Sequence, residues 1–445
     1  MTTVTCLGAT WLSQWRARRE GVSRPARTRG VRHGGPLLAA SAIAALVAMG
    51  CHVGAAQAAP RLKVLFSFTN LKGAFPYAGL IADDSGNLYG ATTGGGANGS
   101  GVVFELSPPA AGDKHWSETV LRSFNQTHGN NAVGDVIADG AGNFYGTTVH
   151  GGANDQGVVF ELSPPKGGRK AWTETVLRSF GGPDGEAPEA GLITDGAGNL
   201  YGTTSRGGAV GDGVVFELSP PKTGKKTWTE TVLQSFRGAD GQGPYGSLLA
   251  DGAGNLYGAT QFGGANGGGV VFELSPPAGG RTAWTETVLK NFAGGRHGYS
   301  SNGGLVSDAA GNLYGTAAED GANGDGVVFE LSPPGVGKKS WSETVLQSFD
   351  GPDGSRPAAG LILDGAGNLF GTTQEGGASG VGVVFELSPP KVGRKSWTET
   401  VLQSFNGTNG EYPAAGLIAD GAGAFYGVTE NGGSNGCGVV FKLTP

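Results

Sequence analysis

The strongest constraint on this chain is a six-residue phrase, Gly-Val-Val-Phe-(Glu/Lys)-Leu, that occurs seven times. Successive copies are 56 residues apart, except for one interval of 57. Their phenylalanines are Phe104, Phe160, Phe216, Phe272, Phe329, Phe385 and Phe441. A period this regular, from about residue 62 to the last residue, indicates one structural unit copied seven times. Positions shared by all copies are expected to be scaffold, so a specific function should lie where the copies differ.

Each repeat predicts four β-strands, here called a, b, c and d from the centre outward. In the copy that begins at Gly191, strands are expected over 191–195, 199–204, 213–218 and 228–236. A glycine turn separates the first two strands, and Ser-Pro-Pro ends the third because proline cannot donate to a ladder. β-branched and aromatic residues dominate these segments, and the 86 glycines of the chain argue against helices. The predicted fold class is all-β.

Seven copies of four antiparallel strands predict a seven-bladed β-propeller. The ends of the chain refine this prediction. Residues 62–68 resemble strand d and have no a, b or c strand before them, whereas residues 416–445 supply a, b and c without a d strand. We therefore expect the N-terminal strand to complete the last blade, which closes the ring and removes exposed sheet edges.

Residues 1–58 are typical of a signal or targeting segment, which leaves the propeller as residues 59–445. A basic stretch precedes a 13-residue apolar run at 37–49, and Ala-Gln-Ala at 56–58 fits a cleavage site. The apolar run is shorter than the roughly 20 residues of a membrane span, so a signal peptide is favoured over an anchor. The true start codon and lipidation of Cys51 are left open.

The charge of the mature part excludes one class of partner. Beyond residue 58 the chain has 24 basic and 36 acidic residues, a net charge of −12. Nucleic-acid binding depends on clustered positive charge, so we expect no nucleic-acid partner. We also expect no stable membrane span in the mature chain. The predicted location is exported, whether periplasmic, cell-surface or secreted.

The run Asp-Gly-Ala-Gly-Asn-Leu-Tyr-Gly-Thr-Thr-x-x-Gly-Gly-Ala-Asn-x-x-Gly-Val-Val-Phe-Glu-Leu resembles the repeat of the bacterial GloVer family of exported tandem-repeat proteins. Residues 195–218 and 364–387 show it with small departures at Val210 and Ser379, and related runs fill all seven copies. The resemblance implies a cell-surface or secreted protein, often with a C-terminal sorting anchor, and it transfers no enzymatic activity. Because the sequence ends at Pro445, directly after the last strand, release without such an anchor is expected.

Two repeated motifs could be mistaken for cofactor or metal sites. The glycine-rich loop 94–101 is followed by a β-strand, whereas phosphate loops precede a helix. The Asp-Gly-Ala-Gly-Asn segment offers one carboxylate and one amide before apolar residues, too few oxygen ligands for an EF-hand-type calcium site. An aspartate that caps its own turn explains it better. We predict no metal and no cofactor.

Three further sets of residues have structural interpretations that we favour. The tryptophans that begin strand d could stack on sugars, but their strict repetition favours packing: Trp116, Trp172, Trp228, Trp284, Trp341 and Trp397. The lysine-rich c–d linkers are interpreted as solvated turns, with an anionic envelope partner as the alternative. The histidines beyond residue 58 lie in different repeats and form no nucleophile or metal motif, so no catalytic residue is predicted. Two of them, His128 and His297, align with turn aspartates such as Asp184.

The positions that vary between copies lie in the b–c and d–a loops, which share one face of a propeller around its central channel. The residue before the Gly-Gly of the b–c loop differs in nearly every copy, as does the residue two before strand a. Asp135 also replaces a glycine at the head of strand a. The candidate ligand-binding residues are Tyr77, Asp135, His150, Glu189, Arg206, Tyr245, Phe262, Asn302, Glu319, Glu375 and Asn431. Ligands favour loops on a rigid scaffold, although neutral drift would produce the same variation.

The sequence favours an exported, non-enzymatic propeller that binds a glycan or an envelope protein through this face. One alternative is a metal-assisted propeller enzyme, lactonase- or lyase-like, for which Asp135, Glu189 and Asn302 are the convergent polar candidates. The other alternative is a purely structural surface repeat. The ligand and the oligomeric state are not predicted.

Overall fold

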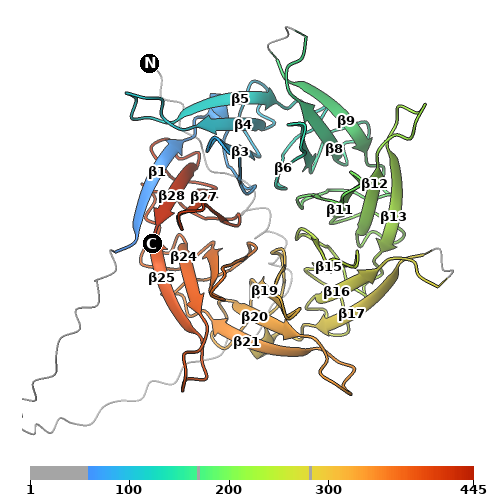
Figure 1. Ribbon diagram of the computed structural model, residues 1–445, viewed down its shortest axis with the longest axis vertical. Helices are drawn as coiled ribbons and strands as arrows, with labels where there is room; N and C mark the ends of the chain where they lie inside the picture. The colour runs from blue at the N-terminus through green and yellow to red at the C-terminus, as the bar shows by residue number, and fades with distance from the viewer. Residues whose placement is uncertain (1–58, 168–170, 280–282) are drawn as a thin grey trace, which may run out of the picture. The chain divides into compact units, whose positions relative to one another are not determined.

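The computed structural model describes residues 59–167, 171–279 and 283–445, so the predicted signal segment at 1–58 lies outside the described residues. Within the described part, 28 strands form seven four-stranded antiparallel sheets, arranged as blades around a common axis (Figure 1). The described helices are two short 3₁₀ turns, η1 (Asn70–Lys72) and η2 (Gly295–His297). The seven-bladed propeller is thereby confirmed. Within these ranges no helix has the length and apolar character needed to cross a membrane.

Each blade contains four strands that run from the axis to the rim. Blade 1 has β2 (Ile81–Ala82), β3 (Leu88–Ala91), β4 (Val102–Ser107) and β5 (Ser117–Ser123), and blade 2 has β6 (Ile137–Ala138), β7 (Phe144–Thr148), β8 (Val158–Ser163) and β9 (Thr173–Ser179). Blade 3 has β10 (Ile193–Thr194), β11 (Leu200–Thr204), β12 (Val214–Ser219) and β13 (Thr229–Ser235), and blade 4 has β14 (Leu249–Ala250), β15 (Leu256–Ala259), β16 (Val270–Ser275) and β17 (Thr285–Asn291). Blade 5 has β18 (Val306–Ser307), β19 (Leu313–Ala317), β20 (Val327–Ser332) and β21 (Ser342–Ser348), and blade 6 has β22 (Ile362–Leu363), β23 (Leu369–Thr373), β24 (Val383–Ser388) and β25 (Thr398–Ser404). Blade 7 has β26 (Ile418–Ala419), β27 (Phe425–Thr429), β28 (Val439–Thr444) and, from the other end of the chain, β1 (Arg61–Ser67).

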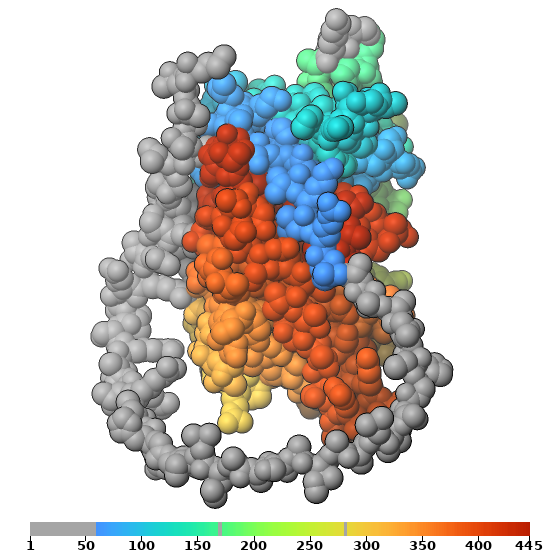
Figure 2. Space-filling model, turned by 90° about the vertical axis from the view of Figure 1, so that its left-hand side faces the viewer, coloured from blue at the N-terminus to red at the C-terminus, as the bar shows by residue number. Residues whose placement is uncertain are grey.

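Blade 7 closes the ring as the sequence predicts. Its strand order is β1-β28-β27-β26, with β1 antiparallel to β28 from the pair Arg61 and Thr444 to the pair Ser67 and Val439. In the space-filling view the blue N-terminal strand lies against the red C-terminal strands (Figure 2). Since β1 occupies the rim position of strand d, the edge of β28 is paired.

Strand a is shorter than expected. The prediction placed it at 191–195, but β10 contains Ile193 and Thr194 alone. Asp195 belongs to the turn that follows, and the Gly191 N–H donates instead to Ser247 Oγ of blade 4, at 3.1 Å. The head of strand a therefore connects neighbouring blades near the axis and does not extend its own sheet.

The repeated phrase builds the core between blades. Phe216 of β12 is fully buried and meets Phe180, which follows β9 of blade 2, in an edge-to-face pair with ring centroids 5.2 Å apart. The same ring covers Gly202 of β11, where an added Cβ would lie 2.7 Å from the Phe216 ring. A side chain in place of this glycine of strand b would overlap the phenylalanine of strand c. The close packing of the two residues explains why both recur in every copy.

The tryptophans pack between blades. Trp228 is half-buried against the core that joins blades 2 and 3, and its ring centroid lies 6.2 Å from that of Tyr145 in the blade before it. The pairs Tyr201–Trp284 and Tyr314–Trp397 repeat this arrangement. The prediction of packing is thereby confirmed for these side chains.

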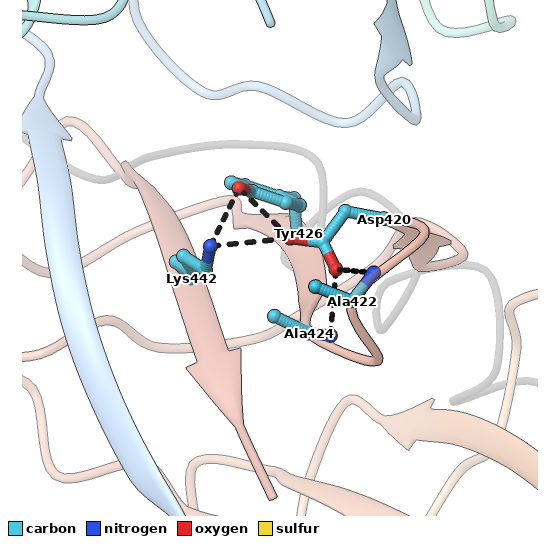
Figure 3. Close-up of polar contacts among 5 residues, drawn as sticks. All are labelled: Asp420, Ala422, Ala424, Tyr426 and Lys442. Carbon is cyan, nitrogen blue, oxygen red and sulfur yellow. Dashed lines mark hydrogen bonds and ion pairs between the residues drawn. The ribbon is translucent and has the colours of Figure 1, made fainter.

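The turn aspartates cap their own turns. Asp195 Oδ1 accepts from the N–H groups of Ala197 and Asn199, both at 2.9 Å, while Oδ2 accepts from Asn199 Nδ2 and the Tyr201 hydroxyl. In blade 7, where alanine replaces the asparagine, Lys442 Nζ supplies the missing donor to Asp420 at 3.1 Å and also donates to Tyr426 (Figure 3). These contacts confirm the predicted role of the aspartate in capping its own turn.

Candidate functional site

The b–c and d–a loops are joined to each other on one face of the ring, which we call the loop face. In blade 3 the Glu186 N–H donates to Arg206 O at 2.8 Å, and the Arg206 N–H donates back to Glu186 O at 3.0 Å. An equivalent antiparallel bridge occurs in each of the seven copies. The predicted sharing of one face by these loops is therefore confirmed.

One left-handed position in each d–a loop connects two blades. The φ of Arg356 is 59°; its N–H donates to Asp325 O of blade 5 and its carbonyl accepts from the Gln374 N–H. The seven residues at this position are Phe75, Asn131, Ala187, Gly243, Ser300, Arg356 and Tyr412. Left-handed backbone costs a non-glycine residue about 1–2 kcal/mol, and these hydrogen bonds hold the residues in it. The loop face is consequently a rigid frame.

The frame places a second set of variable residues near the axis. Each carbonyl of a left-handed residue accepts from the residue that follows strand b, and we call these residues the inner ring: Thr93, Val149, Ser205, Gln261, Ala318, Gln374 and Glu430. Gln374 Nε2 reaches the Tyr77 hydroxyl at 3.4 Å, and Ser205 Oγ donates to Glu189 at 2.8 Å. The structure thus brings the predicted residues Tyr77 and Glu189 to the inner ring.

The inner ring was not predicted from the sequence, although a signal was present. The residue immediately before each candidate b–c position also differs in nearly every copy. Successive side chains of an extended strand point in opposite directions, so the two neighbouring positions serve different surfaces. The predicted position therefore faces outward, and the unnoticed one faces the axis.

Carboxyl groups of the inner region have altered acidity. Burial raises the pKa of Glu189 to about 7, against the opposing effects of the Ser205 hydrogen bond and of Arg206, and burial raises the pKa of Glu430 to about 7. Burial, with Glu430 as the next cause, raises the pKa of Tyr77 to about 12. Tyr77 belongs to blade 1, Glu430 to blade 7 and Glu189 to blade 3, so the loops of three blades contribute to one electrostatic environment.

Asp135 lies at the head of strand a in blade 2. It comes two residues after Val133, the position that corresponds to Tyr77 in blade 1. Its Oδ1 accepts from the Gly79 N–H of blade 1 at 2.5 Å. Although the residue as a whole is exposed to solvent, burial of its carboxyl group raises the pKa of Asp135. Asp135 therefore spans two blades at the level where Gly191 and Ser247 make the same kind of contact.

The predicted b–c residues form an outer ring on the same face: His150, Arg206, Phe262, Glu319, Glu375 and Asn431. Arg206 lies 3.8 Å from Glu186, and Arg356 lies 3.6 Å from Glu375. Phe262 is 36% exposed and meets the Tyr299 ring edge-on, with centroids 6.4 Å apart.

Of the remaining candidates, Asn302 is 3.4 Å from Ser300 Oγ, and Tyr245 lies in the d–a loop near Gly243. In the residues that the structure describes, no group of three or more His, Cys, Asp or Glu side chains is arranged to hold a metal ion.

Fold and site together define a tandem-repeat β-propeller with one variable face. The model of the Gloeobacter/Verrucomicrobia repeat family matches residues 112–306 and 280–445, more than half of the chain. The chain therefore belongs to this repeat family, as the resemblance to the GloVer repeat predicts.

Two solved structures are also similar to this chain. A protein from Thermus thermophilus described as a putative oxidoreductase (glucose dehydrogenase) is 15% identical, with a TM-score of 0.40 over 86% of this chain and 100% of that one. A protein from Bacteroides uniformis described as a putative 6-phosphogluconolactonase is 13% identical, with a TM-score of 0.46 over 73% of this chain and 84% of that one. No curated protein matches the chain significantly. Nothing about the activity of this chain follows from likeness at this level.

Proposed function

We propose that this protein binds a carbohydrate on its loop face, with the inner ring as the contact set. The observation that carries the proposal is one hydrogen-bonded frame, repeated seven times, that presents a different side chain near the axis in almost every copy. Tyr77, Glu189, Gln374 and Glu430 combine an aromatic ring with hydrogen-bond donors and acceptors. This combination suits a sugar, which offers apolar ring faces and many hydroxyl groups.

A glycan-array screen of the purified protein, followed by calorimetric titration of the strongest ligand, tests the proposal. Tyr77→Phe and Glu430→Gln keep the shape of each side chain, and we expect each to weaken binding about tenfold, as loss of a buried hydrogen bond does. Lys225→Ala, in the exposed linker between β12 and β13, provides the control and should bind normally. Binding that these inner-ring variants leave unchanged would refute the site. Capture of an envelope protein with no glycan bound would refute the ligand class.

An enzyme that acts on such a ligand is the second candidate function. The observation in its favour is the pair of carboxyls, Glu189 and Glu430, whose pKa values are raised to about 7 in the region around Tyr77. Groups that titrate near neutrality are suited to acid–base chemistry. Incubation of the bound glycan with the protein should release shortened or unsaturated products in this case. An unchanged glycan favours the binding protein.

A further inference from the structure

The outer strands of neighbouring blades meet at a recurring contact, which we call a seam. In blades 2 to 6 a glutamate near the start of strand d faces a side chain near the end of strand d in the blade before it, and in blade 7 Leu62 takes the place of the glutamate. The side chain near the end of strand d is Arg122 in blade 1, Arg178 in blade 2, Gln234 in blade 3, Lys290 in blade 4, Gln347 in blade 5 and Gln403 in blade 6. The seams therefore differ in whether they contain a cation.

Four seams join a buried glutamate to a cation. At the seam of blades 7 and 1, Lys72, which follows β1, pairs with Glu118 at 3.1 Å. Arg122 Nε lies 2.5 Å from Glu174, whose side chain is 2% exposed, and Lys290 forms an ion pair with Glu343. Arg178 contacts two carboxylates at once, Glu230 of blade 3 at 2.5 Å and Asp184 of the d–a loop. At the seam of blades 2 and 3, one cation therefore lies between two carboxylates.

Two seams keep the carboxyls and lack the cation. Gln234 Nε2 occupies the place of the Arg178 guanidinium and donates to Asp240 at 3.1 Å and to Glu286 at 2.5 Å. At the seam of blades 5 and 6, Gln347 Nε2 donates to Asp353 at 2.7 Å, and Glu399 has the position of Glu230. At the first of these seams a neutral amide therefore bridges two acidic groups, and at the second a neutral amide contacts one of the two.

Buried carboxylates without a counter-charge favour the protonated form. Burial and then Asp240 raise the pKa of Glu286 to about 8, while burial followed by Asp353 and Asp350 raises the pKa of Glu399 to about 7. Opposite Glu286 in its own sheet is Leu274, and opposite Glu399 is Leu387, so neither β16 nor β24 supplies a charge there. For comparison, the pKa of Glu230 beside Arg178 is raised to about 6.

We propose that the seams between blades 3 and 4 and between blades 5 and 6 are pH-responsive joints, closed while a carboxyl at each is protonated and loosened when it ionises. Glutamate ionises near pH 4.5 in the unfolded chain, so the stability that these groups lend to the folded ring is complete below that pH. It is lost as the pH rises toward 7 at Glu399 and toward 8 at Glu286. The two joints enclose blades 4 and 5, so this two-blade sector should loosen first.

Hydrogen exchange measured at pH 5.5 and pH 8.5, corrected for the intrinsic exchange rate, tests the proposal. We expect protection in β17 and β25 to fall at least about tenfold at the higher pH, the effect of a pKa shift of one unit or more. Strand β9, whose seams contain Arg122 and Arg178, should lose clearly less protection, because the pKa of Glu230 beside Arg178 is raised only to about 6. An equal fall in all three strands would overturn the proposal.

Variants that copy the chain's own seams sharpen this test. Gln234→Arg supplies the cation found in blade 2 and should abolish the pH effect at β17 while leaving that at β25. Gln403→Arg is the matched control, because the blade that follows has Leu62 in place of the glutamate, and it should change neither. If Gln234→Arg does not fold, Glu286→Gln should likewise remove the effect at β17. A pH effect that persists at β17 in either folded variant would refute the joint.

Discussion

At the scale of single residues, the turn aspartates show how much structure one carboxylate can organise. Each carboxylate accepts up to four hydrogen bonds from its own turn, and in blade 7 Lys442 substitutes for the asparagine. These hydrogen bonds lower the pKa of Asp195 against the opposing effect of burial. The motif was predictable because the partners of Asp195 lie within six residues of it.

Removal of one turn aspartate should measure this contribution. We expect Asp195→Ala to lower the free energy of unfolding by about 1–3 kcal/mol, because several donors lose a charged acceptor. Because the pKa of Asp195 is lowered in the folded state, its stabilisation is present above the unfolded pKa and disappears as the pH falls through the folded one. Urea unfolding at pH 7 and pH 3 tests both points, with the exposed Asp84→Ala as the control. Equal losses in the two variants would contradict this interpretation.

At the scale of elements, strands b and c pack as a matched pair of glycine and phenylalanine. Gly202 has an ordinary backbone conformation, so its requirement arises from the Phe216 ring and the Leu192 side chain, which would lie 2.7 and 2.8 Å from an added Cβ. Strand identity, strand order and the packing of the tryptophans could all be predicted from the period and the β-propensity of the repeat. The seams could not, because they depend on contacts between distant residues, such as that of Gln234 with Glu286, 52 residues apart. The inner ring was not predicted, because the variation alone does not tell which side of a strand end faces the axis.

A double substitution tests the glycine–phenylalanine pair. Gly202→Ala should cost about 1–3 kcal/mol, because the new methyl group overlaps the Phe216 ring. Phe216→Leu in the same chain should recover part of this loss. Gly196→Ala, at a turn position where an added Cβ meets no atom within 4 Å, is the matched control and should be nearly neutral. Additive losses from the two core changes would show that glycine is required there for another reason.

At the scale of the whole molecule, closure depends on one strand from the far end of the chain. Strand β1 pairs with β28 over the length of both. Deletion of residues 59–67 should expose the edge of β28, lower the midpoint of thermal unfolding and cause association. A circular permutant that attaches the same strand after Pro445 through a copy of the c–d linker should keep the midpoint. A deletion variant that melts like the intact chain would contradict the closure.

The distribution of variable groups across the molecule follows from the same architecture. The sequence predicted that specific chemistry would lie where the copies differ, and it gave the loop face, Tyr77 and Glu189 as candidates. It did not identify Gln374 or Glu430, because strand alternation makes adjacent positions face different surfaces. The ring therefore consists of a uniform scaffold with variable groups concentrated near the axis on one face.

The most direct test of this account is a titration of the strongest glycan ligand against a fourfold variant in which Tyr77, Glu189, Gln374 and Glu430 are replaced by alanine. We expect binding to fall at least about a hundredfold, while the midpoint of thermal unfolding stays within a few degrees, because the frame is held by backbone hydrogen bonds. The same number of substitutions in the c–d linkers should leave binding intact. Undiminished binding by a folded fourfold variant would contradict the central claim.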